Sequence, residues 1–120
     1  MKKIAFIGRQ KLLYQGMEAV LRMHPGLELQ LLPQLFPQNA LLDVEIYQPD
    51  VAVIDVEMEK EALFALCREL HRVLPFCRRL LLVSDTESSL CIEARREGYA
   101  EDFVYTDSSM HFLLAKLQAL

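Results

Sequence analysis

Residues 49–58 have the sequence PDVAVIDVEM, in which a short apolar run is followed at once by an aspartate. The run Val51 to Ile54 is too short for a helix, and it lacks the alternation of a half-buried strand. Continuous apolar runs of this length are typical of strands that are buried on both faces in a parallel sheet. Asp55 therefore places a carboxylate where a buried strand is predicted to end.

Three similar runs occur elsewhere in the chain: Ile4 to Ile7, Leu80 to Val83 and Phe103 to Tyr105. In Leu27 to Leu32, by contrast, apolar and polar residues alternate, which is typical of an edge strand with one more open face. The sequence therefore predicts five strands.

Apolar residues recur at helical spacing between the predicted strands. The clearest stripe runs from Leu63 to Leu74, and a short helix is predicted from about Asn39 to Tyr47; each ends before a proline. Ser108 or Ser109 is expected to cap the last helix. The other stripes are Leu13 to Leu21, Leu90 to Ala94, and Met110 to Leu117.

The predicted order is strand then helix, repeated five times in a single domain, residues 1–120. Parallel strands need right-handed crossover helices. The fold class is therefore α/β: a flavodoxin-like, doubly wound domain with a five-stranded parallel sheet in the order 2-1-3-4-5.

Composition narrows the function classes. The chain has 120 residues, of which 52% are hydrophobic and 25% charged, and this balance is typical of a soluble globular domain. Its net charge of −4 argues against a nucleic-acid surface. The three cysteines fit no zinc spacing, and we expect Cys67 and Cys91 to be small buried residues in a reducing cytoplasm. No stretch is long enough to span a membrane.

Polar residues follow the predicted strands, where ligands of such sheets bind. The strand ends supply Gly8, Arg9 and Gln10, then Asp55 and Glu57, then Ser84 and Asp85, and finally Thr106 and Asp107. From the sequence alone, Asp55 fits a helix cap as well as it fits a functional carboxylate.

Residues 49–58 resemble the phosphoacceptor strand of response-regulator receiver domains, and the resemblance covers essentially the whole chain. Residues 7–17 are similar to the start of the NarL/LuxR-type subfamily. The resemblance implies that Asp55 is the phosphoacceptor position and that Ser84 and Phe103 are switch positions.

The chain departs from the family pattern in the pocket around Asp55. The family's acidic pair falls on Gly8 and Arg9, and Thr106 stands where a lysine is expected. Because Mg²⁺ needs carboxylate ligands, we expect weak or no metal-dependent phosphorylation and no cofactor other than a weakly bound Mg²⁺. The degenerate pocket comprises Gly8, Arg9, Glu57, Asp85 and Thr106.

Arg9 allows two interpretations. Its guanidinium could pair with Asp55 in place of the missing cation, or it could extend into water along the first helix. The sequence leaves both open.

Receiver domains commonly signal through the face formed by the fourth helix, the fifth strand and the fifth helix. Ile92 and Phe112 fall off the apolar stripes of their helices, which favours an interface, although scattered surface apolar residues are common. The predicted interface comprises Ile92, Arg95, Arg96, Tyr105 and Phe112, with Met110 as an alternative to Phe112.

The sequence thus favours an atypical, non-enzymatic receiver domain that acts by dimerisation or by docking to a protein partner. It would regulate transcription through an output domain outside this chain, and DNA would be bound only there. The alternatives are a working phospho-switch, with a sensor histidine kinase as partner and Asp55 as acceptor, and a small-molecule-binding flavodoxin-like domain that uses the same crevice.

Overall fold

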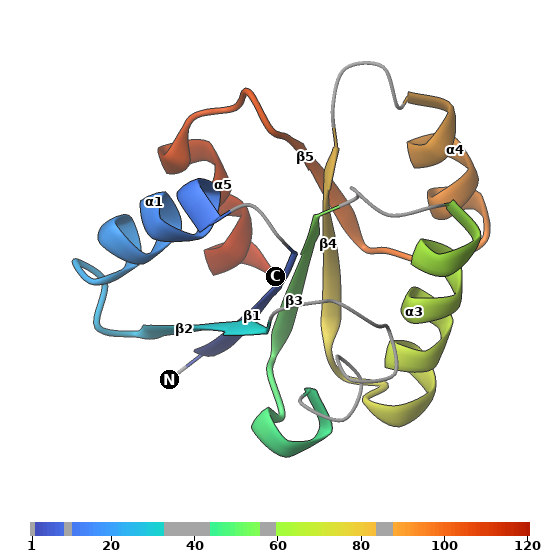
Figure 1. Ribbon diagram of the computed structural model, residues 1–120, viewed down its shortest axis with the longest axis horizontal. Helices are drawn as coiled ribbons and strands as arrows, with labels where there is room; N and C mark the ends of the chain where they lie inside the picture. The colour runs from blue at the N-terminus through green and yellow to red at the C-terminus, as the bar shows by residue number, and fades with distance from the viewer. Residues whose placement is uncertain (1, 9–10, 33–43, 56–59, 84–87) are drawn as a thin grey trace.

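The computed structural model describes residues 2–8, 11–32, 44–55, 60–83 and 88–120 (Figure 1). All five strands are parallel, in the order β2-β1-β3-β4-β5, so the predicted fold class and strand order are confirmed. The elements are β1 (Lys2–Ile7), α1 (Lys11–Leu21), β2 (Leu27–Leu32), β3 (Val51–Asp55), α3 (Lys60–Val73), β4 (Arg78–Val83), α4 (Ser88–Arg96), β5 (Asp102–Tyr105) and α5 (Met110–Ala119). Residues 44–47 are helical, and the remainder of the helix predicted from Asn39 lies outside the described residues.

Two hydrophobic cores enclose the sheet, one on each face. Figure 1 shows α1 and α5 on one side and α3 and α4 on the other. Val51 and Val53 of β3 belong to the core under α1 and α5, whereas Ala52 and Ile54 belong to the core under α3 and α4. This burial on both faces explains why the decisive strand is a continuous apolar run.

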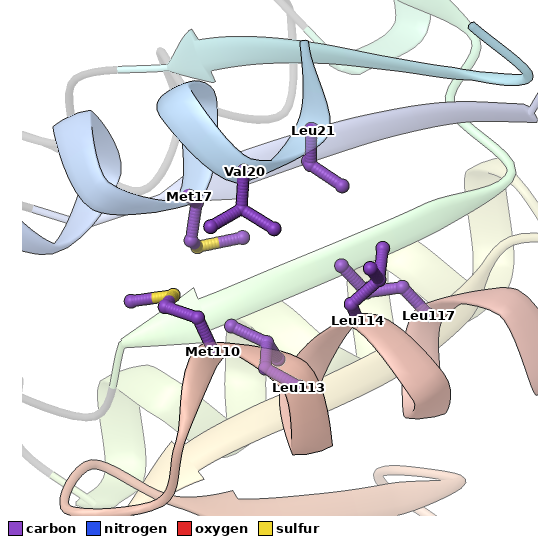
Figure 2. A pocket seen from close by; sticks show the side chains of 7 residues that line it. All are labelled: Met17, Val20, Leu21, Met110, Leu113, Leu114 and Leu117. Carbon is purple, nitrogen blue, oxygen red and sulfur yellow. The ribbon is translucent and has the colours of Figure 1, made fainter. Parts of the chain in front are cut away.

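Helices α1 and α5 pack along an apolar seam, seen in Figure 2. A Cβ atom added to Gly16 would lie 3.3 Å from Met110 Cε, so a small residue brings the two helices close. Met110 therefore belongs to this seam and not to the predicted interface. Ser109 caps α5, because its side chain accepts a hydrogen bond of 3.1 Å from the Phe112 N–H. This confirms one of the two predicted caps.

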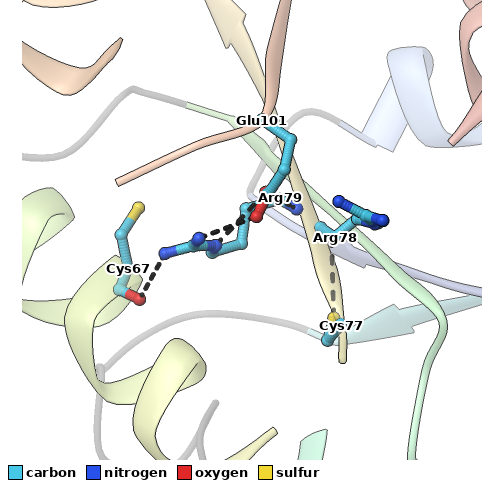
Figure 3. Close-up of polar contacts among 5 residues, drawn as sticks. All are labelled: Cys67, Cys77, Arg78, Arg79 and Glu101. Atoms are coloured by element: carbon cyan, nitrogen blue, oxygen red, sulfur yellow. Dashed lines mark hydrogen bonds and ion pairs between the residues drawn. The ribbon is translucent and has the colours of Figure 1, made fainter. Parts of the chain in front are cut away.

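A buried ion pair joins the start of β4 to the residue before β5 (Figure 3). Arg79 is only 4% exposed, and its guanidinium donates to Glu101 Oε1 at 2.8 Å and to Glu101 Oε2 at 3.3 Å. A third bond of 3.3 Å reaches the Cys67 carbonyl of α3. The sequence prediction began this strand at Leu80, and therefore did not place Arg79 within the sheet.

The cysteines differ in their burial. Cys67 and Cys77 are buried, and loss of hydration raises the pKa of each thiol to about 12. Cys91 is only half-buried, so the expectation that it would be a buried residue is wrong. Among the described residues, no helix has the length and hydropathy that a membrane span requires.

Replacing Arg79 with methionine should lower the free energy of unfolding by about 3 kcal/mol, because Glu101 loses a partner in a partly buried position. The double change Arg79→Met with Glu101→Leu should recover most of this loss. Chemical denaturation measures both values. Arg22→Ala removes the exposed ion pair between Arg22 and Glu18 and is the matched control, with an expected cost of about 0.5 kcal/mol. Equal costs for the two single changes would contradict the proposed role of the Arg79 pair.

Candidate functional site

Asp55 is the last residue of the central strand β3, and only 3% of it is exposed. It pairs in register with Leu82 of β4, and β1 lies on the other side of β3. The carboxylate therefore lies at the carboxyl end of the strands, as predicted, but it is covered by the protein around it.

Gly8, the residue directly after β1, lies close to Asp55. A Cβ atom built on Gly8 would lie 2.7 Å from Asp55 Cβ and 3.4 Å from Asp55 Oδ2. It would also lie 3.0 Å from the Phe6 ring. Contacts below 3.0 Å between such carbons are not tolerated without a shift of the backbone. A side chain at position 8 would therefore overlap Asp55 unless the backbone shifted.

Of the other residues predicted for this pocket, the structure describes Thr106. Arg9, Glu57, Ser84 and Asp85 lie outside the described residues, so the predicted pair of Arg9 with Asp55 stays a prediction. Thr106 is exposed, and its backbone N–H donates to the Val83 carbonyl at 2.9 Å. It extends the pairing of β4 and β5 and brings no positive charge to the crevice.

The described residues around Asp55 do not form a set that fits a magnesium ion. Mg²⁺ is held in proteins by one or two carboxylates together with water and phosphate oxygens. The residues at positions 8 and 9 are glycine and arginine, neither of which supplies an oxygen ligand from a side chain. Within the described ranges, no group of three or more potential ligands could hold a metal ion. Positions 8 and 9 therefore add no carboxylate to that of Asp55.

A second feature lies between α4 and β5. It is a groove of about 560 Å³, which we call the α4–β5 groove, lined by Cys91, Ile92, Arg95, Arg96, Phe103 and Tyr105. Four of the five residues of the predicted interface thus line a single depression. The fifth, Phe112, is exposed on α5 outside the groove lining, where the Lys116 ammonium lies 5.5 Å from its ring centre.

The groove combines cations with apolar surface. The Arg95 guanidinium lies 5.0 Å from the centre of the half-buried Phe103 ring, within the range of a cation–π interaction. Ile92 is 67% exposed, so it presents apolar surface beside the two arginines. Arg96 forms a looser ion pair of 3.5 Å with Glu97.

The strand that carries Phe103 and Tyr105 is firmly held. Lys116 of α5 binds Asp102 at 2.8 Å, while Glu101 is bound by Arg79. Burial by itself raises the pKa of Asp102, but the hydrogen bonds from Lys116 and from the Phe103 N–H outweigh it and leave the pKa below its usual value. Three successive residues of this segment, 101–103, therefore each contact a cation from a different element. The groove thus has a rigid wall.

Replacing Gly8 with alanine should lower the free energy of unfolding by about 1–3 kcal/mol, because the new methyl group overlaps Asp55 Cβ. Urea denaturation with a single optical probe measures the change. Gly26→Ala is the matched control, because a Cβ atom at Gly26 would meet no atom within 4 Å. If both substitutions have the same small effect, the close approach of Gly8 to Asp55 is absent in solution.

Comparisons with known proteins place this geometry in a structural family. No family model matches the sequence, and no curated protein matches it. Among solved structures, an adenylate cyclase from Rhodopirellula baltica superposes with a TM-score of 0.84 at 18% identity, over 98% of this chain and 85% of that chain.

Two response regulators superpose equally well. One is a two-component response regulator from Clostridium difficile, with a TM-score of 0.82 at 18% identity, over 99% of this chain and 94% of that chain. The other is a DNA-binding response regulator of the LuxR family from Staphylococcus aureus, with a TM-score of 0.82 at 16% identity, over 99% and 98% of the two chains. Sequence identities of 16–18% to these structures show a shared fold and no more. The chain therefore has the fold of response-regulator receiver domains.

Proposed function

We propose that this chain is an atypical receiver domain, which signals by docking to a protein partner and not by metal-dependent phosphorylation of Asp55. The observation that carries the proposal is the packing of the Gly8 backbone against Asp55. The acceptor carboxylate is buried, and the residue beside it leaves no space for the acidic side chain that a metal pocket requires.

Phosphoryl transfer makes demands that the described residues of this pocket do not meet. The transferred group spreads negative charge over its oxygens, and a metal ion or cationic side chains must stabilise that charge. The incoming donor must also reach the acceptor oxygen in line with its leaving group. A carboxylate that is 3% exposed offers no such approach in this conformation, and Thr106 supplies no cation.

The α4–β5 groove supports the docking part of the proposal. It is bounded by exposed apolar and aromatic side chains, and both of its charged lining residues, Arg95 and Arg96, are arginines. Arginine and aromatic residues are enriched where protein interfaces have their strongest contacts. Charge complementarity favours a partner segment that carries carboxylates beside apolar residues. Two grooves of like charge would fit each other less well, so docking is preferred here over the dimerisation that the sequence also allowed.

The proposed biological setting is transcriptional regulation through an output domain outside this chain. The likeness to the DNA-binding response regulator from Staphylococcus aureus supports this setting. The working phospho-switch remains the second candidate, because Asp55 does end the central strand at the carboxyl edge of the sheet. The third candidate, a small-molecule site in this crevice, has no observation in its favour among the described residues.

Beryllofluoride with Mg²⁺ mimics a phosphorylated aspartate and tests the loss of phosphorylation. We expect the amide resonances of residues near Asp55 to stay unchanged at saturating reagent, because the carboxylate is buried and the described residues form no ligand set for the metal. Two-dimensional NMR of the labelled chain provides the measurement, with Asp55→Asn as the matched control. New resonances in the native protein that are missing in Asp55→Asn would favour the phospho-switch.

The α4–β5 groove should bind a synthetic helical peptide whose exposed face alternates glutamate and leucine, and the amide resonances of Ile92, Phe103 and Tyr105 should shift. Reversing both charges with Arg95→Glu and Arg96→Glu should reduce the affinity at least tenfold, which corresponds to about 1.4 kcal/mol. Phe112→Glu is the matched control, since Phe112 is exposed outside the groove lining. Equal binding of a lysine–leucine peptide would show that the groove has no preference for acidic partners.

A further inference from the structure

We infer that the opposite end of the sheet carries a self-complementary surface through which two copies of this chain pair. We call it the amino-edge surface. It is formed by the segment that leads into β3 and by the connection between α3 and β4, and both lie along the lower edge of the molecule in Figure 1. Asp55 and the pocket around it belong to the other end of the strands. The inference therefore does not depend on the proposed function.

A groove and a protruding aromatic ring lie side by side on this surface. The groove has a volume of about 300 Å³ and lies between Gln48, Pro49 and Asp50 on one side and residues 73–77 on the other. Phe76, on its rim, is 94% exposed, the highest value among the exposed large apolar residues described. Burying a phenylalanine side chain is worth about 1.5–3 kcal/mol, so this exposure leaves a sizeable favourable term unused.

A second exposed apolar side chain adds to this surface. Ile46 is largely exposed on the helical turn directly before Gln48. Pro75, next to Phe76, is exposed as well. Exposed apolar residues thus occur in both segments that form the amino-edge surface, and exposed apolar surface of this kind is typical of an interface.

Backbone hydrogen bonds hold both rims of the groove in place. The Arg78 N–H donates to the Asp50 carbonyl at 2.9 Å, and the Asp50 N–H donates to the Lys3 carbonyl at 2.8 Å. On the other rim, the Cys77 N–H donates to the Leu74 carbonyl at 3.0 Å. The turn that carries Phe76 is thus closed by its own hydrogen bond and continues directly into β4, whose first residue is bound to Asp50. A surface that is rigid before binding loses less conformational entropy when it binds.

Gln48 adds a conformational constraint at the same place. Its φ of 57° lies in the left-handed region, which is costly for residues other than glycine. The Gln48 N–H donates to the Val44 carbonyl at 2.8 Å, and its side chain donates to the Glu45 carbonyl at 2.7 Å. These two bonds end the helical turn abruptly and direct the chain into Pro49, which forms one wall of the groove.

The arrangement of knob and groove favours a second copy as the occupant. In a two-fold interface the same patch must serve both partners, and here one patch supplies both the ring and the depression that could receive it. Each Phe76 would enter the groove of the other copy, which closes the assembly at a dimer. The patch also carries both signs of charge, because Asp50 and Arg78 are both exposed, so a two-fold can set opposite charges together.

The size of the surface sets the strength of this dimer. Stable interfaces contribute roughly 20–30 residues from each partner, and the groove with its rim offers fewer. The dimer should therefore be weak, with a dissociation constant in the range of about 10 μM to 1 mM.

Sedimentation velocity of the full chain over that concentration range tests the inference. We expect a monomer–dimer equilibrium whose weight-average sedimentation coefficient rises with concentration and stops at the dimer. Phe76→Ser should abolish the rise. Because its side chain is already in water, the substitution should leave the fold intact, which circular dichroism verifies. Leu12→Ser is the matched control, since Leu12 is 84% exposed on α1 and should not matter.

Three outcomes would overturn the inference. They are a chain that stays monomeric at every concentration, a Phe76→Ser variant that associates as the native chain does, and the formation of species larger than a dimer. A further variant, Ile92→Glu, separates the two faces, because it alters the α4–β5 groove alone. If Ile92→Glu loses the dimer and Phe76→Ser retains it, self-association belongs to the α4–β5 groove and not to the amino-edge surface. The beryllofluoride result does not bear on any of these outcomes.

Discussion

The close contact between two parallel strands that are buried on both faces governs this molecule. β1 and β3 pair from Ile4 with Val51 to Ile7 with Ile54, and their side chains fill both cores in alternation. Because β1 and β3 are paired in register up to Ile7 and Ile54, the next residue of each strand lies beside the other. Gly8 is the residue whose lack of a side chain permits that approach.

The same contact connects the fold to the state of the pocket. In an open crevice, a carboxylate at the end of β3 would face water and any ion held there. Here Asp55 is buried, and the glycine and arginine at positions 8 and 9 supply no carboxylate. The energetic cost of a covered carboxylate has to be offset by the packing of the strands around it.

Much of this could be predicted from the sequence because it depends on local patterns. The apolar runs gave the strands and their order, and Ser109 followed from ordinary capping chemistry. The close approach of Gly8 to Asp55 depends on the distance between two strands, which no local pattern encodes. The pair of Arg79 and Glu101 likewise depends on the register of β4 with β5, in which Leu80 lies opposite Asp102. The prediction began β4 at Leu80, whereas the strand begins at Arg78 and therefore includes Arg79.

Stability and interaction are thus divided between different parts of the molecule. The buried pair of Arg79 and Glu101, together with Lys116 on Asp102, fixes the strand that forms one wall of the α4–β5 groove. Backbone bonds around Asp50 fix the amino-edge surface in the same way. Ion pairs or backbone hydrogen bonds thus hold the segments that carry both exposed apolar surfaces. At the other site, Gly8 lies close to the buried Asp55. The two proposed surfaces, the cationic α4–β5 groove and the self-complementary amino-edge surface, are formed by different elements, so one can be occupied independently of the other.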